Sequence, residues 1–135
     1  MGEFVMKRIV HDAHRDNDFY IESAGTHDDG VGYHPYKPVR EIFTREGIDW
    51  GDKRGRQLEK SDYERFDLFI GMDRGNVEDM RRLFDGDPEG KVTLLLDYAG
   101  MHRDVADPWY TRDFETSWNE VNTGCKALYD CLTQY

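Results

Sequence analysis

The stretch Val-Thr-Leu-Leu-Leu at residues 92–96 decides the class of fold. It is a continuous apolar run, which is typical of a strand buried on both faces of a parallel sheet. Short apolar stretches at residues 19–23 and 68–72 predict two further strands. Helical patterns alternate with these strands, and this alternation predicts an α/β fold of packed layers.

Four main helices are predicted around these strands. The clearest covers residues 114–132, because apolar residues recur there at alternating spacings of four and three. The members of this apolar stripe are Phe114, Trp118, Val121, Cys125, Leu128 and Leu132. The other helices are predicted over residues 3–15, over residues 35–46 with Gly47 as the stop, and from an N-cap at Asp73 to about residue 84.

Length and composition indicate a single domain over residues 1–135. The apolar share of 38% and the charged share of 34% are ordinary for a globular protein, and no apolar run reaches membrane-spanning length. The net charge of −10 opposes binding to nucleic acid and to anionic membranes, because both are bound through their phosphates. Neither is therefore an expected partner.

The first ten residues and the cysteine content favour a cytoplasmic protein. No charged region followed by an apolar one marks a signal peptide. Cys125 and Cys131 are the only cysteines, and they make no secreted disulfide framework. His11 and His14 lie one turn apart on a polar helix end, where histidines are typically solvated, so no metal site is predicted.

Asp107 is the strongest candidate for a catalytic residue. It precedes Pro108, and proline restricts both its own backbone and that of the residue before it. Two aromatic residues follow, Trp109 and Tyr110, so the loop offers a carboxyl group beside an apolar surface. Such a loop suits a general acid that protonates a leaving oxygen. The plainer alternative is an Asp-Pro step that only initiates a turn.

Four stretches share an order and spacing with one family of enzymes. They are Ile-Glu-Ser-Ala-Gly-Thr at 21–26, Arg-Gln-Leu at 56–58, Gly-Met-Asp-Arg-Gly-Asn at 71–76 and Arg-Asp-Val-Ala-Asp-Pro-Trp-Tyr at 103–110. In this combination the chain resembles the low-molecular-weight protein-tyrosine phosphatases. The resemblance implies a three-layer α/β fold with a parallel sheet. It also implies hydrolysis of phosphotyrosine proteins or aryl phosphates through a cysteinyl-phosphate, without metal or cofactor.

The resemblance assigns expected roles to four residues. Asp107 matches the residue that acts as acid and then as base. Trp109 and Tyr110 match the substrate cleft. Ser23 matches a serine that braces the phosphate-binding loop, although it could simply end its strand. The cleft is expected to be of a divergent bacterial type, because Lys53 replaces a histidine that is common in the family.

The centre of the family's active site has no counterpart in this sequence. The family's reaction begins at a Cys-x5-Arg-Ser loop, but Cys125 falls on the apolar stripe and no arginine follows Cys131. In relatives this loop is followed by Pro-Met-Ala-Glu, whereas this sequence opens with Met-Gly-Glu-Phe. The chain is therefore expected to begin just after the loop, to lack the first, central strand, and to be inactive as given. The alternative is a genuine short protein that serves as a non-catalytic interaction module, a pseudophosphatase.

The missing central strand has an expected structural consequence. In the family this strand lies between those that correspond to residues 19–23 and 67–72, so both would face a gap. The two strands could close up, or another segment of the chain could fill the gap. We favour a homodimer through the gap, because an open strand edge tends to recruit another chain.

Overall fold

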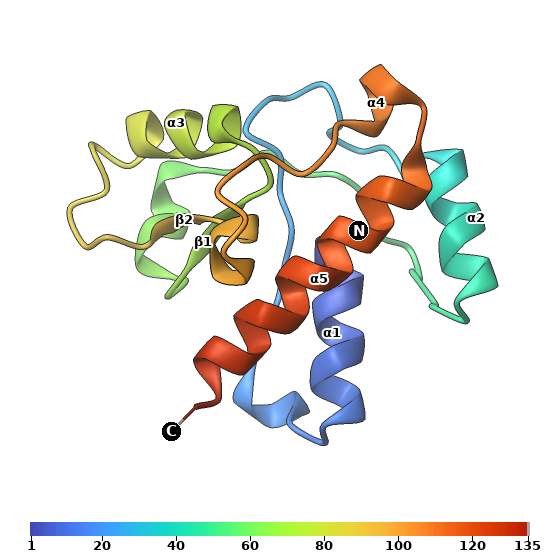
Figure 1. Cartoon of the computed structure of the whole chain (residues 1–135). Coiled ribbons are helices and arrows are strands. Elements are labelled where there is room, and N and C mark those ends of the chain that lie inside the picture. Colours follow the sequence, from blue (N-terminus) through green and yellow to red (C-terminus); the bar gives the residue numbers. More distant parts are fainter. Residues whose placement is uncertain (135) are drawn as a thin grey trace.

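The computed structural model describes residues 1–134, apart from the side chains of Trp109 and Tyr110. Its elements are α1 (Gly2–Asp12), η1 (Asp16–Asp18), α2 (Lys37–Arg45), η2 (Lys60–Glu64), β1 (Phe69–Gly71), α3 (Arg74–Leu83), β2 (Val92–Leu94), η3 (Leu95–Ala99), α4 (Pro108–Thr111) and α5 (Phe114–Leu132). Helices α1 and α5 pack side by side in the middle of the molecule, and α3 lies over the two strands (Figure 1).

The sheet in the described part of the chain consists of β1 and β2, which run parallel with Phe69 opposite Val92. Successive strand residues point to opposite faces. Phe69 accordingly packs in a cluster with residues of α3, whereas Ile70 packs against the cluster formed by α1 and α5. Helices therefore cover both faces of a parallel sheet, and the predicted α/β layer architecture is confirmed.

The predicted strand at residues 19–23 is wrong. Phe19 has extended backbone angles, φ −133° and ψ 138°, but within residues 1–134 this segment belongs to no ladder. Backbone pairing with another segment begins only afterwards, at an isolated bridge between Gly25 and Gln57. A strand is defined by the neighbour that takes its backbone hydrogen bonds, and an apolar pattern does not supply that neighbour. The sheet therefore has two strands among the described residues and not three.

Two predicted helices are shorter than expected because of their end residues. The helix predicted over 3–15 ends at Asp12, since His14 has a φ of 58°, which lies outside the helical region. The helix predicted over 35–46 begins at Lys37, after an extended Tyr36 and with a proline in its first turn. The second half of the 92–96 run is not strand, because Leu95 begins the 3-10 helix η3.

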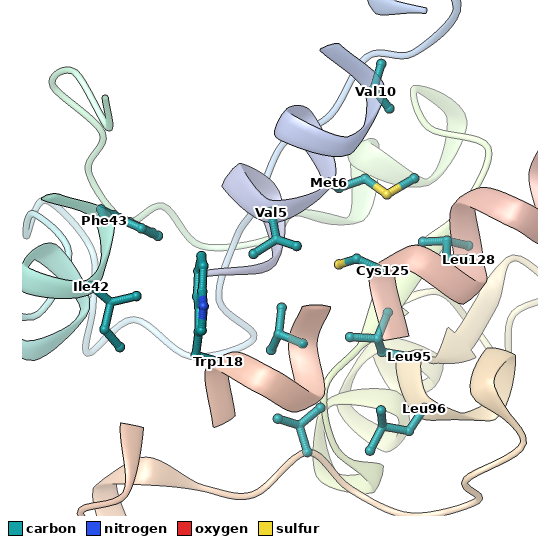
Figure 2. Packing of buried hydrophobic residues seen from close by; sticks show 12 residues of the cluster. Val5, Met6, Val10, Ile42, Phe43, Leu95, Leu96, Trp118, Cys125 and Leu128 are labelled. Atoms are coloured by element: carbon teal, nitrogen blue, oxygen red, sulfur yellow. The ribbon is translucent and has the colours of Figure 1, made fainter. Parts of the chain in front are cut away.

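The core confirms the apolar stripe of α5. Trp118, Val121, Cys125 and Leu128 are buried against α1, α2 and η3, and Phe114 and Leu132 are partly buried at the two ends. Figure 2 shows the Trp118 ring between Phe43 of α2 and Val5 of α1. No helix of residues 1–134 is both long and apolar enough to cross a bilayer.

Gly124 explains how closely α5 approaches η3. A Cβ atom at this position would lie 2.5 Å from Cγ of Leu95, and Leu95 is only 1% exposed. A glycine inside a helix costs helical stability, so its presence here reflects the close contact between the two elements. The position of η3 in turn fixes where the loop that follows it begins.

Candidate active site

Asp107 lies at the end of the loop that connects η3 to α4. Its side chain is exposed, and its backbone carbonyl accepts hydrogen bonds from the N–H of Thr111 at 3.1 Å and from the Thr111 hydroxyl at 3.2 Å. The Asp-Pro step therefore does initiate the helical turn α4, as the plainer interpretation predicts. This geometry is compatible with an acid as well, because the turn leaves the carboxyl group accessible to a substrate.

The loop before Asp107 is fixed to the carboxyl end of β1. The N–H of Val105 donates to the carbonyl of Met72 at 2.9 Å, and the Val105 side chain is buried. Asp104 accepts a 2.9 Å hydrogen bond from the N–H of Arg74 in the first turn of α3. In open parallel α/β sheets, ligands bind beyond the carboxyl ends of the strands. The loop that carries Asp107 is thus anchored beyond the carboxyl end of β1.

The turn from β1 into α3 has the geometry predicted from residues 71–76. Asp73 caps the helix by accepting a 2.7 Å hydrogen bond from the N–H of Asn76. The Asn76 side chain in turn accepts from the N–H of Met72 at 3.2 Å. A Cβ at position 71 would lie 2.9 Å from a methyl carbon of Val77, so any larger residue there would force a neighbouring group to shift.

Ser23 belongs to a second cluster, centred on Glu3, that sequence reasoning missed. The Ser23 hydroxyl donates to Oε1 of Glu3 at 2.7 Å. Lys53 contacts the same oxygen at 2.8 Å, and Lys7 contacts Oε2 at 2.7 Å. The Glu3 side chain is only 5% exposed, so its charge depends on these three partners. The Glu3–Lys7 spacing of one helical turn was a usable signal for part of this cluster.

The Glu3 cluster makes stability depend on pH. Burial raises the pKa of Glu3, but hydrogen bonds from Lys53, Lys7 and Ser23 outweigh it and lower the pKa to about 2. A carboxyl group whose pKa is lower in the folded than in the unfolded state stabilises the folded protein at pH values above its ordinary pKa. This stabilisation is lost as the pH falls toward the lowered pKa. We expect Glu3 to contribute on the order of 2 kcal/mol at neutral pH, because solvent screens the half-exposed Lys7.

This contribution should fade between about pH 5 and pH 2. Urea unfolding of the wild type and of Glu3→Gln across this pH range measures the contribution of Glu3. Glu41→Gln, at an exposed position, is the control. The free energies of unfolding of wild type and Glu3→Gln should differ at neutral pH and converge in acid. Parallel curves over the whole range would contradict the assignment.

Neither cysteine has the surroundings of a catalytic thiolate. Cys125 is 3% exposed, and burial raises the pKa of its thiol to about 11. Cys131 is exposed near the end of α5. A nucleophilic cysteine needs a lowered pKa, and burial gives Cys125 a raised one. The described residues also contain no group of three or more His, Cys, Asp or Glu side chains arranged to hold a metal ion.

Thiol alkylation tests the burial of α5. In the native protein we expect iodoacetamide to modify Cys131 within minutes and to leave Cys125 largely unmodified, because a buried, protonated thiol is a poor nucleophile. Mass spectrometry of peptides reads out the two sites separately, and both should react in urea. Equal native rates at the two cysteines would place this face of α5 in solvent.

The predicted site residues are thus only partly brought together. Asp107 and Ser23 belong to two separately anchored clusters, one on the loop after η3 and one on the segment after η1. The backbone of Trp109 and Tyr110 forms part of α4, but their side chains lie outside the described part of the structure. Their role in a substrate cleft stays a prediction.

Comparisons with known proteins give the family. The profile of the family described as low molecular weight phosphotyrosine protein phosphatase matches residues 1–135. The protein-tyrosine-phosphatase YfkJ of Bacillus subtilis is 30% identical over 130 residues, which are 95% of this chain and 83% of that protein. The phosphatase PtpA of Staphylococcus haemolyticus is 29% identical, over 99% of this chain and 85% of its own length.

Solved structures agree with the sequence comparisons. The crystal structure of YfkJ from Bacillus subtilis has a TM-score of 0.94 at 28% identity, and the match covers 98% of this chain and 85% of that one. SP-PTP from Streptococcus pyogenes has a TM-score of 0.86 at 32% identity, covering 98% and 83% of the two chains. With its sequence matched from end to end and its fold shared with these enzymes, the chain belongs to the low-molecular-weight protein-tyrosine phosphatase family.

Proposed function

We propose that these 135 residues are the acid-bearing body of a phosphatase that acts on phosphotyrosine in proteins or on aryl phosphates. The observation that carries the proposal is the exposed Asp107 on an anchored loop at the carboxyl end of β1, in a chain of this family. Asp107 protonates the phenolate as the ester bond breaks, and later takes a proton from water. Trp109 and Tyr110 contact the aromatic ring, and Ser23 supports the phosphate-binding loop. No metal or cofactor is needed, and the expected location is the cytoplasm.

The 135 residues alone are proposed to lack activity. A cysteinyl-phosphate requires a thiolate that attacks phosphorus while an arginine and backbone N–H groups stabilise the phosphoryl oxygens. The sequence contains no Cys-x5-Arg motif, and the thiol of Cys125 is buried with a raised pKa. The acid is therefore present without the nucleophile that it serves.

Hydrolysis of p-nitrophenyl phosphate by the purified chain tests this statement. We expect no turnover above the buffer rate, with or without added divalent metal. Turnover that disappears in Asp107→Asn would show that another residue of this chain acts as the nucleophile.

The second candidate function is a non-catalytic interaction module, favoured by the absence of a Cys-x5-Arg motif from the sequence. The genomic DNA upstream of the Met1 codon separates the two. An in-frame strand that ends in Cys-x5-Arg-Ser supports the phosphatase, whereas a stop codon with a ribosome-binding signal next to Met1 supports the module.

The open sheet supports a proposal about assembly. Within residues 1–134, β1 pairs with β2 along one edge, and its other edge has no strand as neighbour. We expect a second copy of the chain to cover this edge, because unpaired backbone groups are rarely left buried. Light scattering at micromolar concentration should give about twice the chain mass of 15.9 kDa. A mass near 15.9 kDa together with cooperative unfolding would exclude the dimer.

A further inference from the structure

Two side chains of α5 hold both backbone polar groups of Ala106, the residue directly before the proposed acid. The hydroxyl of Ser117 donates to the Ala106 carbonyl at 2.5 Å. Oε1 of Glu120 accepts the Ala106 N–H at 2.9 Å. Ser117 and Glu120 are three residues apart, so they lie on neighbouring positions of one helical face. We call this arrangement the Ala106 clamp.

The Ser117 side chain is buried and that of Glu120 is nearly so, although both are polar. Ser117 is 0% exposed, and the Glu120 side chain is 11% exposed. The second carboxylate oxygen of Glu120 forms an ion pair with the guanidinium of Arg103. Burial raises the pKa of Glu120, but the Arg103 and Ala106 hydrogen bonds outweigh it and lower the pKa, which keeps the group charged. Buried polar groups of this kind are costly unless they are paired, and the partners at Arg103 and Ala106 both lie in the loop.

The clamp is the last of the anchors that lead to Asp107. Asp104 is bound to α3 and Val105 to the end of β1, as described above, and Ala106 is bound to α5. Residue 107 follows directly and is restricted on its other side by Pro108. The backbone of Asp107 is therefore fixed on both sides.

We propose that Ser117 and Glu120 are positioning residues that set the direction from which Asp107 gives its proton to the leaving group. The proposal rests on the function proposed above for Asp107. Neither residue touches the substrate in this scheme; they act through the backbone of Ala106. A fixed backbone at Asp107 matters because general acid catalysis requires the acid to lie within hydrogen-bond reach of the leaving oxygen.

Amide hydrogen exchange in the full chain tests the clamp without any need for activity. In Glu120→Ala the Ala106 N–H should exchange about tenfold faster or more, the change expected from losing one hydrogen bond to a charged acceptor. Glu120→Gln keeps an acceptor oxygen and should retain most of the protection. Glu115→Ala, on an exposed part of α5, is the control. The Phe69 N–H donates to the backbone carbonyl of Lys91, and its exchange rate reports on global unfolding.

Two outcomes of this experiment would overturn the clamp. The first is an unchanged Ala106 exchange rate in Glu120→Ala. The second is an equal acceleration of the Ala106 and Phe69 amides, which would show that the substitution only lowers global stability.

The consequence for catalysis is tested in an extended chain, which carries a strand and a Cys-x5-Arg-Ser loop before Met1. Ser117→Ala and Glu120→Ala should reduce kcat/KM for phenyl phosphate, a poor leaving group, at least threefold more than for p-nitrophenyl phosphate, a good one. A purely structural role would reduce both rates alike. Thr123→Ala removes an exposed hydroxyl from the same helix and should change neither.

The outcomes separate the positioning proposal from the proposed function. An extended chain whose hydrolysis depends on Asp107 but shows an unchanged leaving-group ratio in Ser117→Ala and Glu120→Ala overturns only the positioning role. An extended chain whose hydrolysis is indifferent to Asp107→Asn overturns the proposed function, and the positioning role with it.

Discussion

The extended chain is expected to hydrolyse aryl phosphates, and Asp107→Asn within it should slow the chemical step by roughly 10²–10⁴. The added loop supplies a thiolate as the nucleophile, and an arginine with backbone N–H groups that bind the phosphoryl oxygens. In the proposed reaction Asp107 supplies the proton that the phenolate needs as the bond to phosphorus breaks. Asparagine has nearly the same shape but no such proton, so the loss measures the acid itself.

Single-turnover kinetics with phenyl phosphate measures this step directly. Alkylation of the added cysteine should abolish activity, whereas alkylation of Cys131 alone should not. Asp130→Asn removes an exposed carboxyl group from α5 and serves as the matched control. A loss in Asp107→Asn of less than about tenfold with phenyl phosphate would mean that the leaving group receives its proton from another group.

The sequence predicts the elements whose signal is periodic and whose partners are close along the chain. The stripe of α5 and the Asp73 cap of α3 appear in the structure as expected, because each depends on residues within a few turns. The prediction of a strand at residues 19–23 is wrong because a strand depends on a partner that is distant along the chain. Its apolar pattern is genuine, but whether it becomes a strand depends on a partner that no local pattern describes.

Long-range polar contacts were the other part that the sequence did not reveal. Glu3 and Ser23 are twenty residues apart, and Lys53 is thirty residues further on, so no local pattern connects these three residues. Ser117 and Glu120 lie beside the apolar stripe of α5, and the sequence does not distinguish them from exposed polar residues of a helix. Their function appears only when the loop is seen against the helix. The candidate acid was therefore predictable from its motif, whereas the groups that fix its position were not.

Trp118→Ala is expected to lower the free energy of unfolding by about 3–5 kcal/mol. The indole is 4% exposed and meets the ring of Phe43 edge-on at 6.2 Å, with the Arg8 guanidinium 5.6 Å from its ring centre. Truncation removes buried apolar area and leaves a cavity where α1, α2 and α5 meet (Figure 2). Close-packed cores relax only partly around such a cavity, so most of the loss should persist.

Urea unfolding followed by circular dichroism measures the change, with Trp50→Ala as the matched control. Trp50 is the same residue type but only partly buried, beside His34 and Arg40, so its truncation should cost clearly less. The urea dependence of the unfolding free energy should stay unchanged in Trp118→Ala, since a shift would indicate a different folded state. A loss below about 1.5 kcal/mol, or equal losses for the two tryptophans, would contradict the central place of Trp118. Helix α5 carries both Trp118 and the Ala106 clamp. The packing that stabilises the fold therefore also fixes the helix that binds the backbone next to Asp107.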